Sequence, residues 1–475
     1  MTAPRLKRPD TPRTATGIVH LGLGAFFRAF GCSYVMDAMT AGGGDWGIVG
    51  VSLRSPDTRD ALRDQDWAYR AVSLGAEGES SRIIDVLNDV LVAPENPQAV
   101  LDAMVSEGVQ IVSLTVTEKG YCHHPASGKL NHDHPDIVHD LAHDLPRSTI
   151  GYLVRALAAR RAAGTRPFTV LTCDNLPQNG QLLRGLVLEF AELLDPDLAS
   201  WIASEARFPS TMVDRITPAT TDADIARLTD AEGTYDAAPV LHEPFSQWVV
   251  EDDFVDDARP DLGAAGVQLV RDVEPFEDMK LRMLNGTHSA LAYTAYLAGH
   301  ETISDTVADP VFATYVRALW GEIVPNVAAP DGVDLAGYSD ALFDRYANQN
   351  IRHKTWQIAM DGSQKLPQRM FGTLRETYQA GRSAPMLTLA VAAWIKYVGG
   401  MDETGAPIDV RDPLADKLRD VLDAALSPAD KVAAVLAIRE IVPADLAPRL
   451  SPPVTAAAQD VWALGTRAAI EKALG

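Results

Sequence analysis

Cysteine is scarce in this chain of 475 residues: only three are present, Cys32, Cys122 and Cys173, and their spacing suits neither a disulfide framework nor a zinc ribbon. Hydrophobic runs are short as well, and none reaches the ~18 residues of a transmembrane helix. The segment Met1–Asp10 is polar and basic and lacks the apolar region of a signal peptide. These absences predict a cytoplasmic protein that does not associate with membranes.

Positive charge is also in deficit, since 42 Lys and Arg face 64 Asp and Glu and the formal net charge is −22. A surface of this sign repels phosphate backbones and anionic lipid, which argues against nucleic-acid binding as the main function. Hydrophobic residues make up 47% of the chain, enough for a buried core. At roughly 100–200 residues per domain, the length predicts two or three domains.

Apolar runs and helical spacing alternate in the first half of the chain. The predicted buried strands are Gly17–Gly22, Trp46–Leu53, Val109–Val116 and Phe168–Thr172, and the predicted helices include residues 25–40 and Ile150–Ala163. Strands that alternate with helices indicate a parallel sheet with crossover helices. From about residue 275, alanine- and leucine-rich helical patterns dominate. We therefore predict an α/β domain over residues 1–270 and an all-α domain over residues 271–475. The acidic stretch Glu251–Gly266 is either their connection or an insertion loop.

A glycine turn, Gly22-Leu23-Gly24, stands where the first predicted strand meets the first predicted helix. Glycine permits a tight turn there, and lets backbone N–H groups, including those of Ala25 and Phe26, approach a pyrophosphate at the helix N-terminus. Arg28 can add a cation. The third glycine of the dinucleotide-binding fingerprint is missing, so an ordinary strand–helix turn explains these residues equally well.

The end of the second predicted strand bears on the choice of cofactor. An Asp or Glu at this place binds the ribose 2′-hydroxyl and favours NAD. Here Leu53-Arg54-Ser55 occupies it, and no acid precedes Asp57. The residues alone leave NAD and NADP open, because Arg54 is suited to a 2′-phosphate.

A helix predicted near residue 275 has a proline and acids in its first turn, as helix N-termini prefer. At about 100° per residue, Glu277, Lys280, Leu284 and His288 fall within a narrow arc, with Asn285 beside it. A cation and an amide can polarise a carbonyl oxygen, and a lysine of lowered pKa can accept the proton of an alcohol during hydride transfer. A solvated face with a Glu–Lys pair at i, i+3 explains the same pattern.

The Lys-x4-Asn-x2-His pattern at Lys280, together with Cys173-Asp174-Asn175 and Met212-Val213-Asp214-Arg215, resembles the mannitol dehydrogenase family of polyol-specific long-chain dehydrogenases. The resemblance covers nearly the whole chain. It implies a Rossmann-type domain followed by a helical domain, an NAD cofactor, catalysis in the cleft and no metal. The sequence departs from the family in its glycine turn, where Phe27 and Phe30 replace two histidines.

The resemblance also implies a role for each polar residue of the motifs. Lys280 is the general acid and base, Asn175 and Asn285 stabilise the oxyanion and hold the lysine, His288 and Asp214 orient the substrate and the lysine, and Glu277 lies on the proton path to solvent. The cofactor-binding set is then Gly22, Gly24, Ala25, Phe26, Arg28 and Arg54.

Two segments, Ser52–Pro56 and Thr117–Cys122, are more similar to the fructuronate reductase (D-mannonate oxidoreductase) branch than to the mannitol branch. A hexuronate carries a carboxylate that cations must recognise, whereas a neutral polyol needs none. The candidate cations are Lys119, Arg352, His353 and Lys365, each of which is also ordinary as a surface residue.

The sequence thus predicts an NAD-dependent oxidoreductase, a monomer or small homo-oligomer, that interconverts D-fructuronate and D-mannonate. A mannitol or D-arabinitol 2-dehydrogenase is the alternative, and a dinucleotide-sensing module without catalysis is a third hypothesis. A histidine-rich segment, His123–His143, includes His139 and His143 at a spacing that metal ligands use on a helix. Because the lysine and the asparagines already supply acid–base and electrophilic functions, we predict a polar surface there and no metal.

Overall fold

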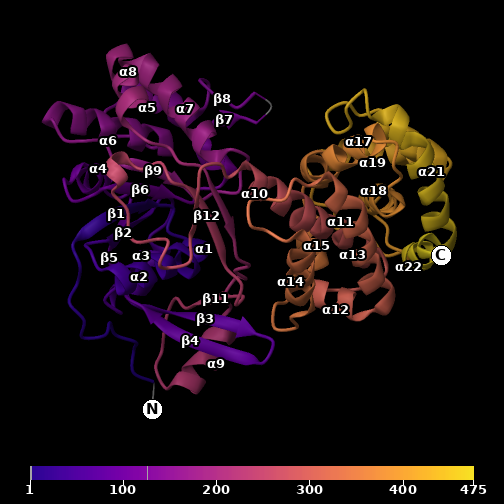
Figure 1. The fold of residues 1–475 in the computed structure, drawn as a ribbon, viewed down its shortest axis with the longest axis horizontal. Coiled ribbons are helices and arrows are strands. Elements are labelled where there is room, and N and C mark those ends of the chain that lie inside the picture. Colours follow the sequence, from indigo (N-terminus) through magenta and orange to yellow (C-terminus); the bar gives the residue numbers. More distant parts are fainter. Residues whose placement is uncertain (1–2, 126) are drawn as a thin grey trace. The chain divides into compact units, whose positions relative to one another are not determined.

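A computed structural model of the chain describes residues 3–125 and 127–475 and divides into two compact units, Met1–Glu274 and Pro275–Gly475 (Figure 1). Among the described residues, every β-strand lies in the first unit, and the second unit is helical. The predicted fold class, an α/β domain followed by an all-α domain, is confirmed. Within the described ranges, no helix is both long enough and apolar enough to cross a membrane.

Five parallel strands form the central sheet of the first unit, in the order β5-β2-β1-β6-β9. They are β1 (Thr16–Leu21), β2 (Gly47–Ser52), β5 (Leu87–Val92), β6 (Ile111–Leu114) and β9 (Thr169–Thr172). All four predicted strands are present, whereas β5 escapes prediction because Asn88 and Asp89 interrupt its apolar run. Since β1 has β2 on one side and β6 on the other, the winding of the chain reverses at the carboxyl end of β1, where open α/β sheets bind ligands.

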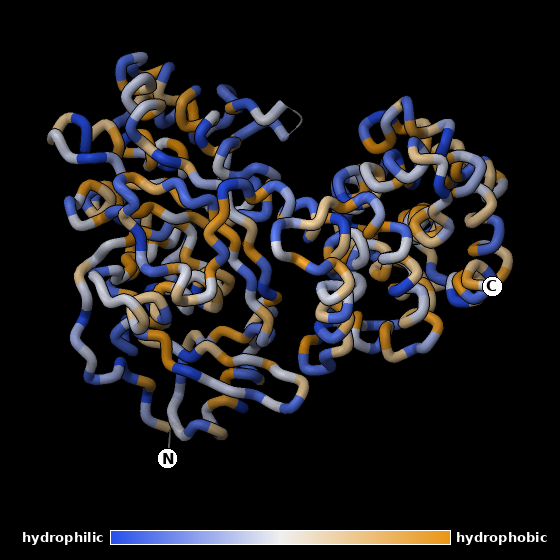
Figure 2. Tube along the Cα trace, viewed as in Figure 1, coloured by the Kyte–Doolittle hydropathy of each residue, from blue (hydrophilic) through white to orange (hydrophobic). Residues whose placement is uncertain are grey.

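Both faces of this sheet are buried, which explains why its strands are continuous apolar runs. Val19 and Leu21 face a core shared with α4 (Pro97–Val105), α6 (Thr149–Ala163), α7 (Asn179–Leu194) and α8 (Pro196–Glu205). Ile18 and Ile48 face a second core that includes α2 (Gly31–Gly42). Figure 2 shows the apolar character of these inner strands.

Smaller sheets complete the first unit. One joins β10 (Thr211–Asp214), β12 (Gln247–Glu251) and β13 (Gln268–Val270), another joins β11 (Val240–His242), β3 (Tyr69–Gly75) and β4 (Gly78–Ile84), and β7 (His123–His124) pairs with β8 (Lys129–Leu130). The stretch Glu251–Gly266 lies between β12 and β13 of one sheet, so it is an insertion loop and not the connection between the units. The remaining helices of this unit are α1 (Ala25–Ala29), α3 (Asp57–Arg63), α5 (Pro135–Ala142) and α9 (Asp222–Glu232).

The second unit is organised around α18 (Pro385–Val398), which is buried along almost its whole length and packs against α11 (Thr287–Leu297), α13 (Pro310–Ile323) and α21 (Ala447–Leu464). Its other α-helices are α10 (Glu274–Met279), which begins one residue before the unit, α12 (Ile303–Ala308), α14 (Leu335–Ala347), α15 (Thr355–Ile358), α16 (Gly362–Leu366), α17 (Gly372–Gln379), α19 (Ala415–Asp423), α20 (Pro428–Leu436) and α22 (Thr466–Leu474). A helix that is apolar on all sides, as α18 is, forms the centre of a bundle.

Glu322 of α13 predicts a pH dependence of stability. Its carboxylate accepts the N–H groups of Met386 (2.8 Å) and Leu387 (2.9 Å) at the start of α18. Burial nevertheless raises the pKa of Glu322 to about 7 from 4.5. A raised carboxyl pKa means that its contribution to stability is present below pH 4.5 and is lost as the pH rises through 7.

We expect the unfolding free energy to fall by at most about 3 kcal/mol over this pH window. Glu322→Gln should flatten that part of the profile, measured by urea unfolding at several pH values. An unchanged slope in the variant would assign the pH dependence to another group.

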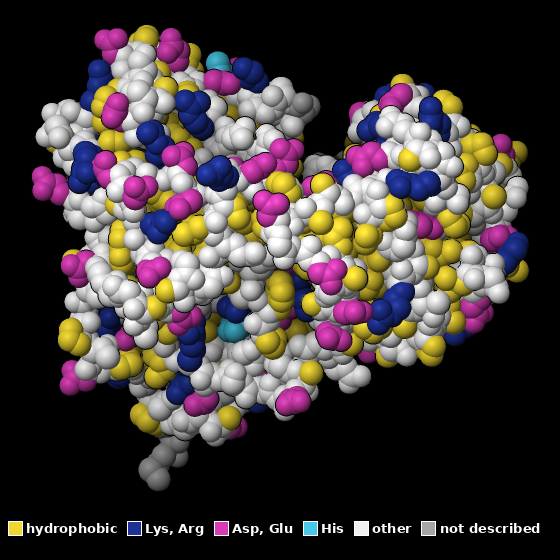
Figure 3. Space-filling model, viewed as in Figure 1, with side chains coloured by type: hydrophobic (Ala, Val, Ile, Leu, Met, Phe, Trp, Pro, Cys, Tyr) yellow, Lys and Arg dark blue, Asp and Glu magenta, His cyan; other side chains and the backbone are white. Residues whose placement is uncertain are grey.

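Charged side chains of both signs are interspersed on the face shown in Figure 3, and no continuous basic surface is visible there. This mixture accompanies the net charge of −22. The expectation that the chain does not bind nucleic acid stays a prediction.

Candidate functional site

The turn after β1 requires glycine at its first position. Gly22 has a φ of +89°, and a Cβ there would lie 2.2 Å from the carbonyl oxygen of Thr115, just beyond β6. The N–H groups of Gly22 and Leu23 both donate to the carbonyl of Val51, at 2.9 and 3.1 Å. The turn is therefore pinned between the ends of β2 and β6.

The second glycine leaves space above the turn. A Cβ on Gly24 would meet only the Gly22 carbonyl oxygen, at 3.8 Å. The N–H of Gly24 donates to that same carbonyl at 2.7 Å, so the turn's own donors are already in use. The donors left for an anion are those at the start of α1, on Ala25 and Phe26, because the first N–H groups of a helix have no partner within it.

Arg28 is buried and bound within the first unit. Its Nη1 donates to the carbonyl of Ala238 at 2.6 Å, and its guanidinium lies over the ring of Tyr69, 5.1 Å from the centroid. A contact between Arg28 and a cofactor stays a prediction. Arg54, in contrast, is exposed after the end of β2 and makes no hydrogen bond or ion pair with another described residue.

The two phenylalanines that replace the family's histidines are core residues. Phe27 stacks on the ring of His20 with a centroid separation of 3.3 Å, and Phe30 packs against Trp248 at 5.3 Å. His20 also contacts the hydroxyl of Ser113 at 2.8 Å, and burial lowers its pKa to about 3. The ring of Phe27 thus stacks on a neutral imidazole that a hydrogen bond holds in place. The side chain at position 27 faces the protein interior.

The residues after β9 and at the end of β10 include the predicted Asn175 and Asp214. Asn175 is exposed, whereas Asp214 is 4% exposed. The amide of Asn179 joins the two segments: its Nδ2 donates to the carbonyls of Asp174 (2.8 Å) and Thr211 (2.9 Å), and its Oδ1 accepts the Thr211 N–H at 2.9 Å. Sequence patterns gave no signal for Asn179, because Thr211, which it joins to the end of β9, lies 32 residues further along the chain.

In the second unit, Lys280 begins a π-helix, η3 (Lys280–Gly286), between α10 and α11. The prediction of a regular α-helix through residues 277–288 is wrong over this segment. A π-helix closes i→i+5 hydrogen bonds, is rare, and is frequently found at functional sites. Lys280 and His288 are 7% and 6% exposed, whereas Glu277 and Asn285 are partly exposed.

Three consecutive carbonyls of η3 accept hydrogen bonds from side chains elsewhere in the second unit. Met283 accepts from Trp320 Nε1 (3.3 Å), Leu284 from the Tyr346 hydroxyl (3.2 Å) and Asn285 from Arg369 Nη1 (3.5 Å). Arg369 Nη1 also donates to the Ser289 hydroxyl at 3.0 Å. These donors hold the widened turn, and no local sequence pattern indicates any of the three.

A second π-helix, η5 (Pro367–Phe371), packs against the first. A Cβ at Gly286 would lie 2.9 Å from the carbonyl oxygen of Arg369, so glycine permits this close approach. The two irregular segments therefore support each other, one carrying Lys280 and Asn285 and the other Arg369.

Burial keeps the imidazoles of this region neutral at neutral pH. Burial, then His353, Arg345 and Arg369, hold the pKa of His288 well below its usual range. Its ring lies 4.8 Å from that of Tyr346 and 5.2 Å from that of His353. Burial and Lys365 lower the pKa of His353 to about 4.

Of the predicted basic residues, Lys365 and Arg352 have different surroundings. Lys365 Nζ donates to the carbonyls of Met360 (2.6 Å) and Ile358 (3.3 Å), and burial and Arg369 lower its pKa to about 8. Arg352 is exposed and lies 3.7 Å from Glu301 in a surface ion pair. Lys119, in the first unit, is exposed and has no hydrogen bond or ion pair with another described residue.

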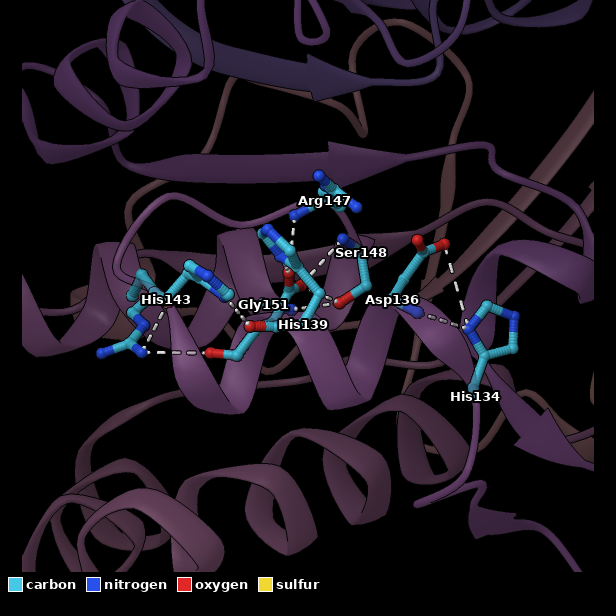
Figure 4. Close-up of polar contacts among 9 residues, drawn as sticks. His134, Asp136, His139, His143, Arg147, Ser148 and Gly151 are labelled. Carbon is cyan, nitrogen blue, oxygen red and sulfur yellow. Dashed lines mark hydrogen bonds and ion pairs between the residues drawn. The ribbon is translucent and has the colours of Figure 1, made fainter.

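The histidines of the segment His123–His143 that Figure 4 labels form their hydrogen bonds with residues close to them in sequence. His139 Nδ1 lies 2.9 Å from Asp140 Oδ1, His143 Nδ1 lies 2.9 Å from the His139 carbonyl, and the two rings stack at 4.3 Å. The Nδ1 atoms of both rings are therefore already in contact with protein oxygens. The predicted absence of a metal site stays a prediction.

One group of possible ligands does converge nearby. Cys122, His134 and Asp136 place ligand atoms within 4.8 Å of one another. However, His134 Nδ1 already accepts the N–H of Asp136 at 3.2 Å, as the cap of α5. The Nδ1 lone pair of His134 therefore caps the helix and needs no metal ion to explain its position.

Comparison with known proteins gives two family matches that together span most of the chain. The model of the mannitol dehydrogenase Rossmann domain matches residues 16–264, and the model of the mannitol dehydrogenase C-terminal domain matches residues 272–462.

Individual relatives are similar over nearly their full length. An uncharacterized oxidoreductase of Escherichia coli is 46% identical over 92% of this chain and 90% of its own. The D-mannonate oxidoreductase of Escherichia coli is 44% identical over 96% of both chains. The mannitol 2-dehydrogenase of Pseudomonas fluorescens, solved as a ternary complex with NAD and D-mannitol, has a TM-score of 0.86 and 38% identity, covering 99% of this chain and 97% of its own.

Proposed function

The chain is an oxidoreductase of the mannitol dehydrogenase family, and from this premise we propose that it uses NAD to interconvert D-fructuronate and D-mannonate. One observation carries the proposal furthest: Lys280, Asn285 and His288 lie on and beside a partly buried π-helix in the domain that matches the family's C-terminal model. A mannitol or D-arabinitol 2-dehydrogenase is the alternative, since mannitol 2-dehydrogenases are also close relatives.

The first unit suits a dinucleotide. The glycine turn lies at the point where the strand order reverses, with open space above Gly24 and the start of α1 behind it. Backbone N–H groups at such a helix start favour a pyrophosphate. When bound, the nicotinamide supplies or accepts the hydride. The residues that would hold the dinucleotide are Gly22, Gly24, Ala25, Phe26, Arg28 and Arg54, and the related mannitol 2-dehydrogenase was solved with NAD.

The chain's own residues supply acid–base chemistry at the carbonyl. Lys280 donates a proton to the oxygen of the keto group during reduction and takes it back during oxidation. Asn175 and Asn285 donate amide N–H groups to the developing oxyanion. Asp214 and the neutral His288 orient the substrate, and Glu277, partly exposed, relays the proton of Lys280 to solvent.

Cations without an ion-pair partner favour a hexuronate over a neutral polyol. Lys119, Lys365 and Arg369 form no ion pair within the described ranges. A substrate carboxylate forms charge-assisted hydrogen bonds with such groups, whereas a polyol hydroxyl forms ordinary ones. The 44% identity to a D-mannonate oxidoreductase supports the same substrate class.

Steady-state kinetics over a panel of substrates test this function. Fructuronate and tagaturonate are reduced with NADH, mannonate, mannitol and arabinitol are oxidised with NAD, and the products are identified by NMR. Highest kcat/KM on fructuronate and mannonate supports the proposal, whereas highest kcat/KM on a polyol supports the alternative. Binding of NADH with no turnover of any substrate would indicate a sensing module.

Activity is expected to survive exhaustive EDTA treatment. Lys280 and the two asparagines polarise the carbonyl without a Lewis acid, so chelation removes nothing that the reaction needs. Turnover is measured before and after dialysis, with and without added zinc. Loss that zinc restores would contradict the mechanism and implicate Cys122, His134 and Asp136.

NAD is expected to be preferred over NADP. The preference follows from the family, since the related mannitol 2-dehydrogenase was solved with NAD, whereas Arg54, exposed after the end of β2, is by itself suited to a 2′-phosphate. The ratio of kcat/KM for NADH and NADPH on one substrate measures the preference. A higher value with NADPH, abolished in Arg54→Ala, would reverse this assignment.

A further inference from the structure

Asp174 belongs to the Cys173-Asp174-Asn175 motif and has no role assigned from sequence. It lies at the ends of the neighbouring strands β6 and β9 of the central sheet. It follows β9 directly and is 8% exposed. Its Oδ2 accepts the N–H of Val116 at 2.9 Å and its Oδ1 accepts the N–H of Thr117 at 2.9 Å. The hydroxyl of Tyr121 donates to Oδ2 at 3.0 Å. One carboxylate thus bonds to both ends of the segment Thr117–Tyr121, which follows β6.

The backbone of the segment Thr117–Tyr121, here called the β6 turn, is strained. Thr117 has a φ of +63° and Cys122, just after the turn, a φ of +49°. Residues other than glycine keep such values only when their surroundings hold them there. The N–H of Gly120 donates to the Thr117 carbonyl at 2.9 Å, which closes the turn on itself. Asp174, which lies outside the turn, therefore helps to hold the backbone of the turn in this unfavourable conformation.

The end of the turn is fixed as firmly as its start. Tyr121 is fully buried, and its hydroxyl lies 2.5 Å from the Thr172 hydroxyl as well as against Asp174. Between these fixed ends, Glu118 and Lys119 are exposed. The side chain of Lys119 extends from a short, clamped backbone at the carboxyl end of a parallel sheet, where α/β proteins bind their ligands.

We propose that Asp174 is a positioning residue that holds the β6 turn, and through it directs Lys119 to the carboxylate of a hexuronate substrate. This inference rests on the proposed function, because it needs a substrate with a carboxylate. Its chemical requirement is specific: both oxygens of residue 174 act as acceptors. Asparagine has nearly the same shape but offers one acceptor oxygen and one NH2 group, which would oppose a backbone N–H.

The experiment is a double-mutant cycle between Asp174→Asn and Lys119→Met, read out as kcat and KM for fructuronate and for fructose. In the wild type, Lys119→Met should lower kcat/KM for fructuronate by about 10-fold or more. In the Asp174→Asn background the same change should lower it by less than about 2-fold, because the lysine is no longer directed. The loss in Asp174→Asn should be in KM for fructuronate, with kcat/KM for fructose nearly unchanged.

Two controls separate positioning from general damage. Lys129→Met removes an exposed lysine that pairs with Glu189 at 3.3 Å, and its effect should be the same in both backgrounds. Tyr121→Phe removes one of the three donors to Asp174 and leaves the two backbone N–H groups in place, so it should give a weaker form of the same phenotype. This variant also serves if Asp174→Asn does not fold.

Hydrogen exchange gives a readout that does not depend on the substrate. The N–H groups of Val116 and Thr117 should lose protection in Asp174→Asn, measured by mass spectrometry of peptides that span the β6 turn. Unchanged protection, or additive effects of Asp174→Asn and Lys119→Met, would overturn the proposal. A wild-type enzyme that does not prefer fructuronate to fructose would instead contradict the proposed function, and this is known before any variant is compared.

Discussion

Replacing Lys280 by alanine is expected to lower kcat by at least about 10²–10⁴-fold while NADH binding stays nearly unchanged. In the proposed mechanism the side chain is both the proton donor to the carbonyl oxygen and a positive charge beside the developing oxyanion. It is 7% exposed at the start of η3, so water replaces it poorly in the variant. The glycine turn that suits the cofactor belongs to the other unit and contains none of the altered atoms. Single-turnover kinetics and NADH fluorescence measure the two quantities.

Two further variants identify which property of the lysine matters. Lys280→Arg keeps the charge but cannot release a proton at working pH, so it should be nearly as slow as alanine. Lys354→Ala removes an exposed lysine of the same unit that pairs with Glu301 at 3.1 Å, and should not change kcat. An alanine variant of Lys280 that keeps a tenth of the wild-type kcat would remove this residue from the mechanism.

A keto-hexuronate is expected to be reduced about 10- to 100-fold better than fructose, judged by kcat/KM. A carboxylate held by a cation forms charge-assisted hydrogen bonds of about 1.5–3 kcal/mol each. The net charge of −22 gives no general attraction for an anion, so the preference must come from local cations such as Lys119. Lys119 is free to serve, because no other described residue pairs with it.

Competition kinetics with the two substrates measure this preference directly. Lys119→Met should reduce kcat/KM for the uronate and leave the weak activity on fructose unchanged, whereas Lys129→Met should change neither. If fructose or mannitol equals the uronate in the wild type, the polyol dehydrogenase alternative replaces the hexuronate assignment.

The strands of the central sheet could be predicted from sequence because each is a short apolar run whose burial on both faces leaves a clear pattern. β5 shows the limit of this rule, since Asn88 and Asp89 lie inside a strand that is still part of the sheet. The candidate catalytic residues Lys280, Asn285 and His288 could be named through the resemblance of their motif to the family, whereas their spacing on one helix face is equally typical of a solvated face.

The residues that hold the segment carrying Lys280 and Asn285 in place could not be predicted from sequence. Trp320, Tyr346 and Arg369 reach the carbonyls of η3 from far along the chain, and Asp174 reaches the β6 turn from the end of the neighbouring strand β9. Such pairings depend on tertiary packing, which periodicity does not encode. The replacement of a family histidine by Phe27 likewise became interpretable only through its stacking on His20.

Because Lys280–Gly286 is a π-helix, the geometry of the candidate catalytic motif depends on the number of residues in it as well as on which residues they are. Its wider i→i+5 winding accommodates one residue more than an α-helix would over the same rise. Deleting Leu281 would let α10 run directly into α11 as one regular helix, with every polar side chain of the motif still present. The flanking helices would keep nearly the same rotation relative to each other, because the π-turn takes up the extra residue. The carbonyls of η3 that accept Trp320, Tyr346 and Arg369 would, however, lose the spacing that the widened turn gives them. A related chain that keeps the lysine, asparagine and histidine but has a single-residue gap between them would therefore be expected to fold and to be inactive.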